Sequence, residues 1–198
     1  MKNKNNRKKS RKFQSLVTTA QELFFRFGMK RVTVEEICQE AGVSKMTFYK
    51  FFENKTALAL YILDETISAA EKKYDSIMKM EVPFAQKVEE TIRLKLDQNE
   101  KFSREFFREL LNGEIPEVSK RLFLKMQENM QRVLKDYSEA QARGDIRPDI
   151  KPEFIMYIFN KMIAMISDEE LAKYYNSPRD ITAELTNFFF YGILNREN

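Results

Sequence analysis

The sequence predicts an all-α fold, and three observations lead to that prediction. Only 5 Gly and 5 Pro interrupt the 198 residues, which is few for a turn-rich β protein. Apolar side chains recur at intervals of three to four residues along most of the chain, which is the period of a helix. Residues that favour helix starts and ends stand between these stretches.

The first helix is expected at residues 13–27, where the apolar side chains share one helical face. Gly28 follows, at a position where helices often end in a left-handed conformation. Before this helix, residues 1–12 carry seven positive charges and no apolar side chain except Met1, so they predict a basic flexible arm. The arm is interpreted as a solvated tail, with a phosphate or minor-groove contact as the functional alternative.

Two short helices and a long one are expected next. Thr33 and Glu36 predict a capping box, in which each side chain binds a backbone N–H of the other residue. Ser44 is expected to cap a short third helix. Asn54 is expected to cap a fourth helix that begins at Lys55 and runs towards residue 80.

The rest of the chain predicts five more helices, which gives nine in total with no convincing strand and no repeat. Pro116 and Pro152 fall where a proline in the first helical turn is tolerated. The expected ranges are residues 84–100, 102–111, 118–140, 152–166 and 178–194.

The charge of the chain is divided unevenly between its ends. Up to Lys55 the sequence holds 13 Lys and Arg against 5 Asp and Glu, a net charge of +8, whereas the remainder carries a net charge of −4. A basic end on an acidic body indicates that the N-terminal quarter meets a polyanion.

Composition argues against several other classes of protein. No run of eighteen apolar residues predicts a membrane span, and no apolar stretch follows the basic N-terminus as in a secretory signal. The single cysteine, Cys38, forms no internal disulfide and is expected to be a small buried side chain. A cytoplasmic location is therefore expected.

Nothing in the sequence favours an enzyme. There is no His, which removes the commonest general base and the commonest transition-metal ligand. Adjacent carboxylates such as Glu35 and Glu36 point apart on a helix, so a solvated face explains them. No catalytic residue, metal site or cofactor is expected, and a helical enzyme remains only as an alternative hypothesis.

Residues 33–52, TVEEICQEAGVSKMTFYKFF, predict a helix-turn-helix. Ala41 is small enough for two helices to cross, and Gly42 allows positive φ in the turn. Val43 is expected to fill the corner between the helices. Three apolar side chains are expected to hold the second helix against the first, namely Ile37, Phe48 and Phe51.

The outer face of this second helix carries Ser, Lys, Met and Thr side chains, which suit the major groove of DNA. Lys reaches guanine O6 and N7, and the methyl groups of Thr and Met contact thymine methyls. Inward packing of Met46 is the alternative for that residue. Tyr49, Lys55 and Thr33 are expected at phosphates. Lys55 and Thr33 stand at helix N-termini, which attract anions.

The stretch FGMKRVTVEEICQEAGVSKMTFYKFFENKTAL closely resembles the TetR family of regulators. The resemblance covers about residues 10–60, and the later Gly-Asp-Ile-Arg turn is also similar to that family. Cys38, where Ala is usual, and Phe48, where Leu is common, depart from the pattern. The matching positions are Thr33, Ile37, Ala41, Gly42, Val43, Tyr49, Phe52, Lys55 and Leu58.

The resemblance implies a homodimer that binds a near-palindromic operator in double-stranded DNA. It implies that the last two helices of each subunit form a four-helix interface. It also implies a small-molecule pocket in the body, from which an effector shifts the fourth helix and releases DNA. The Phe and Met side chains of the body favour an apolar or aromatic effector.

Three sets of residues are expected to carry these activities. The expected DNA contacts are Thr33, Val34, Ser44, Lys45, Met46, Thr47, Tyr49, Lys50 and Lys55. The expected pocket residues, each also a candidate for the core, are Phe84, Phe106, Phe107, Met126, Met130, Phe159 and Met162. The expected dimer residues, with burial inside the monomer as the alternative, are Phe154, Tyr157, Ile158, Ile181, Leu185, Phe188 and Phe189.

The sequence thus predicts an arm at residues 1–12, a DNA-binding domain at 13–55 and a helical ligand-binding and dimerisation domain at 56–198. The predicted function is sequence-specific regulation of transcription, with repression favoured over activation. An activator or a ligand-independent regulator of the same fold is the alternative. A membrane-surface or adaptor protein that uses the basic arm is a more remote hypothesis.

Overall fold

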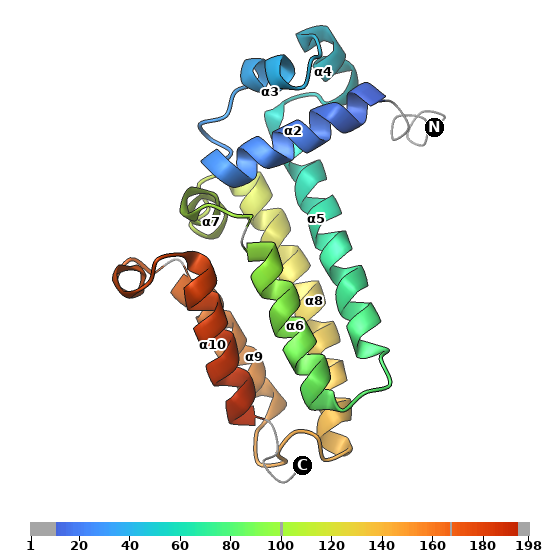
Figure 1. Cartoon of the computed structure of the whole chain (residues 1–198), viewed down its shortest axis with the longest axis vertical. Coiled ribbons are helices and arrows are strands. Elements are labelled where there is room, and N and C mark those ends of the chain that lie inside the picture. The colour runs from blue at the N-terminus through green and yellow to red at the C-terminus, as the bar shows by residue number, and fades with distance from the viewer. Residues whose placement is uncertain (1–10, 100, 167, 194–198) are drawn as a thin grey trace. The chain divides into compact units, whose positions relative to one another are not determined.

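The computed structural model describes residues 11–99, 101–166 and 168–193, and over these residues the protein is all-α, as predicted (Figure 1). These residues form nine α-helices and one short 3-10 helix, and they contain no β-strand. In the described part, no helix combines the length and apolar character needed to cross a membrane.

Three helices come first, and the second and third of them begin directly after the predicted caps, Thr33 and Ser44. They are α2 (Arg11–Phe27), α3 (Val34–Glu40) and α4 (Lys45–Phe51). Two residues of the predicted arm, Arg11 and Lys12, are therefore helical, because α2 begins two residues before the first side chain of its apolar face, Phe13. The other arm residues, 1–10, lie outside the described part.

The later helices also follow the predicted ranges to within a few residues. The structure adds one element that was not predicted, a 3-10 helix at Leu171–Tyr174, which has no apolar period to reveal it. The later α-helices are α5 (Lys55–Met78), α6 (Phe84–Asn99), α7 (Arg104–Leu111), α8 (Pro116–Ala142), α9 (Pro152–Ile166) and α10 (Pro178–Ile193).

The chain folds into two compact units. Unit 1 holds the described residues up to Thr66 together with Glu105–Leu122, and unit 2 holds Ile67–Arg104 and the chain from Phe123 onwards. This division differs from the predicted boundary after residue 55, because the first half of α5, α7 and the start of α8 pack with the N-terminal helices.

The core of unit 1 is rich in aromatic side chains. The ring of Phe13 on α2 lies 5.2 Å from Phe51, 5.6 Å from Phe52 and 5.4 Å from Tyr61, measured between ring centroids. Phe48 is fully buried. Each fully buried side chain of this size stabilises the fold by about 1.5–3 kcal/mol.

Unit 2 has a separate core, in which α10 packs on α6 and α9. Two residues predicted at the dimer face are buried inside it, Ile181 at 1% exposure and Phe189 at 5%. That part of the prediction is wrong, because both sides of α10 are apolar and the sequence pattern does not show which side faces its own subunit.

Candidate nucleic-acid interface

The helix-turn-helix begins with the predicted capping box. The Thr33 hydroxyl accepts the backbone N–H of Glu36 at 3.1 Å, and the Glu36 carboxylate accepts the backbone N–H of Thr33 at 3.5 Å. These bonds satisfy donors that the start of a helix otherwise leaves unpaired. They fix the point at which α3 starts.

The turn between α3 and α4 requires a glycine. Gly42 has a φ of +65°, which residues with a side chain rarely adopt. The next N–H, of Val43, bonds the carbonyl of Cys38 at 2.9 Å and closes the turn. Ser15 on α2 donates its hydroxyl hydrogen to the carbonyl of Ala41 at 2.8 Å, so the turn is also bound to α2.

Helix α4 presents one face to solvent and buries the other. Ser44 caps it by accepting the N–H of Thr47 at 3.2 Å. Phe48 is 0% exposed, whereas Met46 is 72% exposed and Tyr49 is 57% exposed. Met46 therefore points outward, and the alternative of inward packing is wrong.

The remaining predicted DNA contacts of the motif lie in the same region. Lys45 and Lys50 are exposed on α4, and Thr33 is exposed at the start of α3. Val34 and Thr47 are half-buried. Most of the predicted side chains of the motif are therefore exposed, and two of them, Lys45 and Lys50, are basic.

One neighbour of this surface was not predicted. The ammonium of Lys45 forms an ion pair with the carboxylate of Glu35 on α3. The hydrogen bond between them raises the pKa of Lys45 and lowers the pKa of Glu35. The sequence indicated only a solvated carboxylate, because residues ten apart on two helices are brought together by the turn.

Lys55 has a different environment from the one predicted. Its ammonium donates to three backbone carbonyls, of Met29 at 2.7 Å, of Lys30 at 3.1 Å and of Val32 at 2.7 Å. Burial lowers the pKa of this side chain. All three ammonium hydrogens have acceptors inside the protein, so the predicted phosphate contact through this side chain is not supported.

Cys38 on α3 is buried, as predicted. It is 4% exposed, and burial raises the pKa of its thiol above the usual value. A raised pKa disfavours the thiolate, which is the reactive form of cysteine. The buried thiol therefore acts as a small apolar side chain in the packing of α3.

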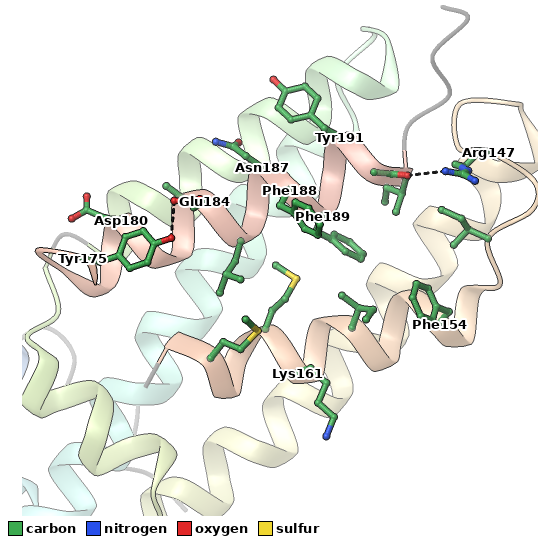
Figure 2. Close-up of a pocket in the computed structure, with 18 residues that line it drawn as sticks. Arg147, Phe154, Lys161, Tyr175, Asp180, Glu184, Asn187, Phe188, Phe189 and Tyr191 are labelled. Atoms are coloured by element: carbon green, nitrogen blue, oxygen red, sulfur yellow. Dashed lines mark hydrogen bonds between the residues drawn. The ribbon is translucent and has the colours of Figure 1, made fainter. Parts of the chain in front are cut away.

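A second candidate surface lies in unit 2, in an open groove between α9 and α10 (Figure 2). Its volume is about 1110 Å³. Phe154 on α9 and Phe188 on α10 line it and are 54% and 83% exposed. Tyr157, which is 57% exposed, also lies on α9. Two other residues predicted at the dimer face, Ile158 and Leu185, line the groove and also pack against the core of unit 2.

The residues predicted to line an effector pocket are divided between the two units. Phe106 packs on Phe25 in unit 1, with ring centroids 5.0 Å apart. Phe84 packs on Tyr137 in the core of unit 2, with ring centroids 5.4 Å apart.

The other predicted pocket residues have equally separate surroundings. Met130 packs against the unit 2 core, and Met162 is buried in it beside the α9–α10 groove. Phe107 and Met126 are half-buried, and the side chain of Phe159 lies outside the described part. The helical period of the sequence indicates which positions are apolar, but it does not indicate which of these side chains lie next to each other in the fold.

Comparisons with known proteins agree with this architecture. Residues 16–62 match the family described as bacterial regulatory proteins, tetR family. The uncharacterised HTH-type transcriptional regulator YhgD of Bacillus subtilis is 28% identical over 160 residues, which cover 78% of this chain and 82% of the relative.

Two solved structures share the fold over most of their length. The regulatory protein TetR from Rhodobacter sphaeroides superposes with a TM-score of 0.73 at 20% identity, covering 93% of this chain and 100% of that one. A transcriptional regulator from Saccharomonospora viridis in complex with choline gives a TM-score of 0.73 at 16% identity, covering 92% and 97%. The capped helix-turn-helix of this chain therefore matches the tetR family of bacterial regulatory proteins, and the chain as a whole shares the fold of the two solved regulators.

Proposed function

We propose that the protein is a repressor that binds a near-palindromic DNA operator as a homodimer and releases it when a small organic effector binds. The observation that carries the proposal is the exposed face of α4, which has two lysines and Met46 on a helix whose opposite side is buried. A rigid helix with this face suits the major groove, where base edges differ most.

The roles of individual side chains follow from their exposure and chemistry. Lys45 and Lys50 read guanine edges or bind nearby phosphates, and Thr47 and Met46 contact thymine methyl groups. Thr33 and Tyr49 bind the phosphate backbone and set the register of the helix. The Ser44 hydroxyl and the half-buried Val34 complete the contact surface.

The α9–α10 groove supports the dimer. Exposed aromatic side chains such as Phe188 are costly in water, and a second copy that covers the same face satisfies both subunits by twofold symmetry. A twofold dimer presents two copies of α4 to half-sites about 34–36 Å apart, which is one turn of DNA.

The proposed effector is a small organic molecule that binds in the helical body. A regulator of the same fold is in complex with choline, so this fold accommodates a small organic molecule in at least one protein. The aromatic and Met side chains of the body favour an apolar or aromatic effector here. Binding that prefers the DNA-free state lowers operator affinity by linkage.

Selection of bound sequences from random duplex DNA tests the proposal. The expected product is a palindromic motif bound with a steep dependence on salt. Repeating the binding with a panel of small apolar and cationic compounds identifies an effector by release of DNA. Failure to enrich any sequence, with no duplex binding at low salt, contradicts the proposed function, and an enriched motif without symmetry contradicts the dimer.

A further inference from the structure

A buried carboxylate from α7 binds the backbone between α2 and α3. Glu109 is 1% exposed, and its two oxygens accept the N–H of Met29 at 2.5 Å and of Lys30 at 3.1 Å. About 80 residues of sequence separate these partners, and all of them belong to unit 1. A carboxylate that accepts two backbone donors makes stronger bonds than a neutral acceptor.

The carbonyl groups of the same backbone segment are bound by Lys55 of α5. The carbonyls of Met29 and Lys30 accept from its ammonium, while their N–H groups donate to Glu109. The N–H and C=O groups of these two residues, which lie between helices, are thus satisfied by two charged side chains from two other helices. Glu109 is buried and Lys55 is half-buried, so each charge requires polar partners, and the backbone groups of this segment provide them.

Close packing keeps the Glu109 carboxylate in place. Gly28 has a φ of +82°, and a Cβ added there would lie 2.7 Å from a carboxylate oxygen of Glu109. One turn earlier on α7, the ring of Phe106 packs edge-on against Phe25 of α2. The Glu109 carboxylate therefore occupies space beside Gly28 that a side chain at that position would fill.

The bound segment leads directly into the DNA-binding helices. Val32, whose carbonyl is also bound by Lys55, is fully buried, and the next residue, Thr33, is the cap of α3. Helix α3 in turn contacts α4. The position of residues 29–32 therefore sets the direction in which α3 starts and where α4 lies.

We propose that Glu109 is a positioning residue for DNA binding, which holds α3 and α4 in the orientation that fits the duplex. Helix α7 begins at Arg104, the last residue of the first stretch of unit 2, and continues into unit 1, so the chain enters unit 1 through the helix that carries Glu109. The inference rests on the proposed function, because orientation matters only if α4 reads DNA.

The variant Glu109→Gln tests this role in the full chain. Glutamine keeps the volume but has one carbonyl oxygen for two N–H donors and turns its amide group towards the other. We expect affinity for the duplex selected with the wild type to fall about tenfold or more. Affinity for a duplex of random sequence should change less than about twofold, because phosphate contacts tolerate a misplaced helix.

Two control variants separate positioning from stability. Glu105→Gln changes an exposed carboxylate on the same helix, and Ile146→Val weakens the core of unit 2. All variants are compared at a temperature where circular dichroism shows them fully folded, and both controls should bind like the wild type. If Glu109→Gln does not fold, Glu109→Asp, which keeps the charge on a shorter side chain, replaces it with the same expectation.

Each outcome decides between the explanations. Selective loss of affinity for the selected duplex in the Glu109 variant supports the positioning role. Unchanged affinity, or an equal loss in Ile146→Val at a matched melting temperature, overturns it. If the wild type binds no duplex at all, the proposed function fails first and the positioning role fails with it.

Discussion

At the scale of single residues, the ion pair between Lys45 and Glu35 limits the charge that α4 offers to DNA. Both side chains are more than half exposed, so the pair adds little to stability. Its effect on DNA binding is larger, because Lys45 must leave Glu35 to reach a base or a phosphate, and a carboxylate beside the DNA repels it.

We therefore predict that Glu35→Gln strengthens duplex binding by about three- to tenfold, a free-energy change on the order of 1 kcal/mol. Fluorescence anisotropy with the selected duplex at fixed salt measures the change. Glu40→Gln on the same helix serves as the control for removal of one negative charge. Weaker binding by the Glu35 variant alone would mean that its carboxylate contacts a base, for example the amino group of cytosine.

Lys55 provides a second residue-scale prediction. Replacement by Met leaves three carbonyls without their donor, so we expect unfolding in urea to become easier by about 1–3 kcal/mol. The dependence of duplex affinity on salt should keep its slope, because all three hydrogens of the Lys55 ammonium already have acceptors inside the protein. A slope reduced by about one would show that Lys55 neutralises a phosphate after all.

The residues that sequence reasoning placed correctly are those whose partners are close in the chain. Thr33 and Glu36 are three residues apart, and the positive φ of Gly42 is a property of that residue's own backbone. Glu109 had no such signal, because its partners lie about 80 residues away. The contacts of Lys55 had no such signal either, since its ammonium binds carbonyls that precede it by more than twenty residues.

At the scale of elements, α4 has seven residues and is too short to be stable alone. Tertiary packing holds it, chiefly through the buried ring of Phe48. The outward side chains of α4 therefore affect recognition, while Phe48 affects folding.

A pair of variants on α4 tests this separation. Phe48→Ala should lower the free energy of unfolding by about 3–5 kcal/mol. Met46→Ala should change it by less than about 0.5 kcal/mol and still weaken binding to the selected duplex. Urea unfolding and anisotropy measure the two effects, and a large loss of stability in Met46→Ala would contradict the division.

The last helix shows what helical periodicity leaves open. Phe188 is exposed and Phe189, its neighbour, is buried, although the sequence predicts both at one interface. Adjacent residues point about 100° apart on a helix, so a run of aromatic residues covers both the core side and the outer side. Only the packing of α10 on α6 and α9 decides which side remains uncovered.

At the scale of the whole molecule, the proposed dimer depends on the exposed α9–α10 face. A charge at the centre of an apolar interface is costly to bury without a partner. Phe188→Glu should therefore convert the dimer to a monomer with unchanged helix content, and sedimentation velocity measures the change. Tyr174→Glu, which alters another highly exposed aromatic residue outside α9 and α10, should leave the dimer intact.

Loss of the dimer should also lower affinity for the full palindrome. A dimer binds its second half-site as an intramolecular event, so a monomer loses that advantage and binds a half-site and the whole palindrome with similar affinity. We expect the palindrome to be bound at least a hundredfold more weakly by Phe188→Glu, an effect on the order expected from bivalency. A Phe188→Glu variant that sediments as a dimer and binds the palindrome normally would place the subunit interface on another face of the molecule.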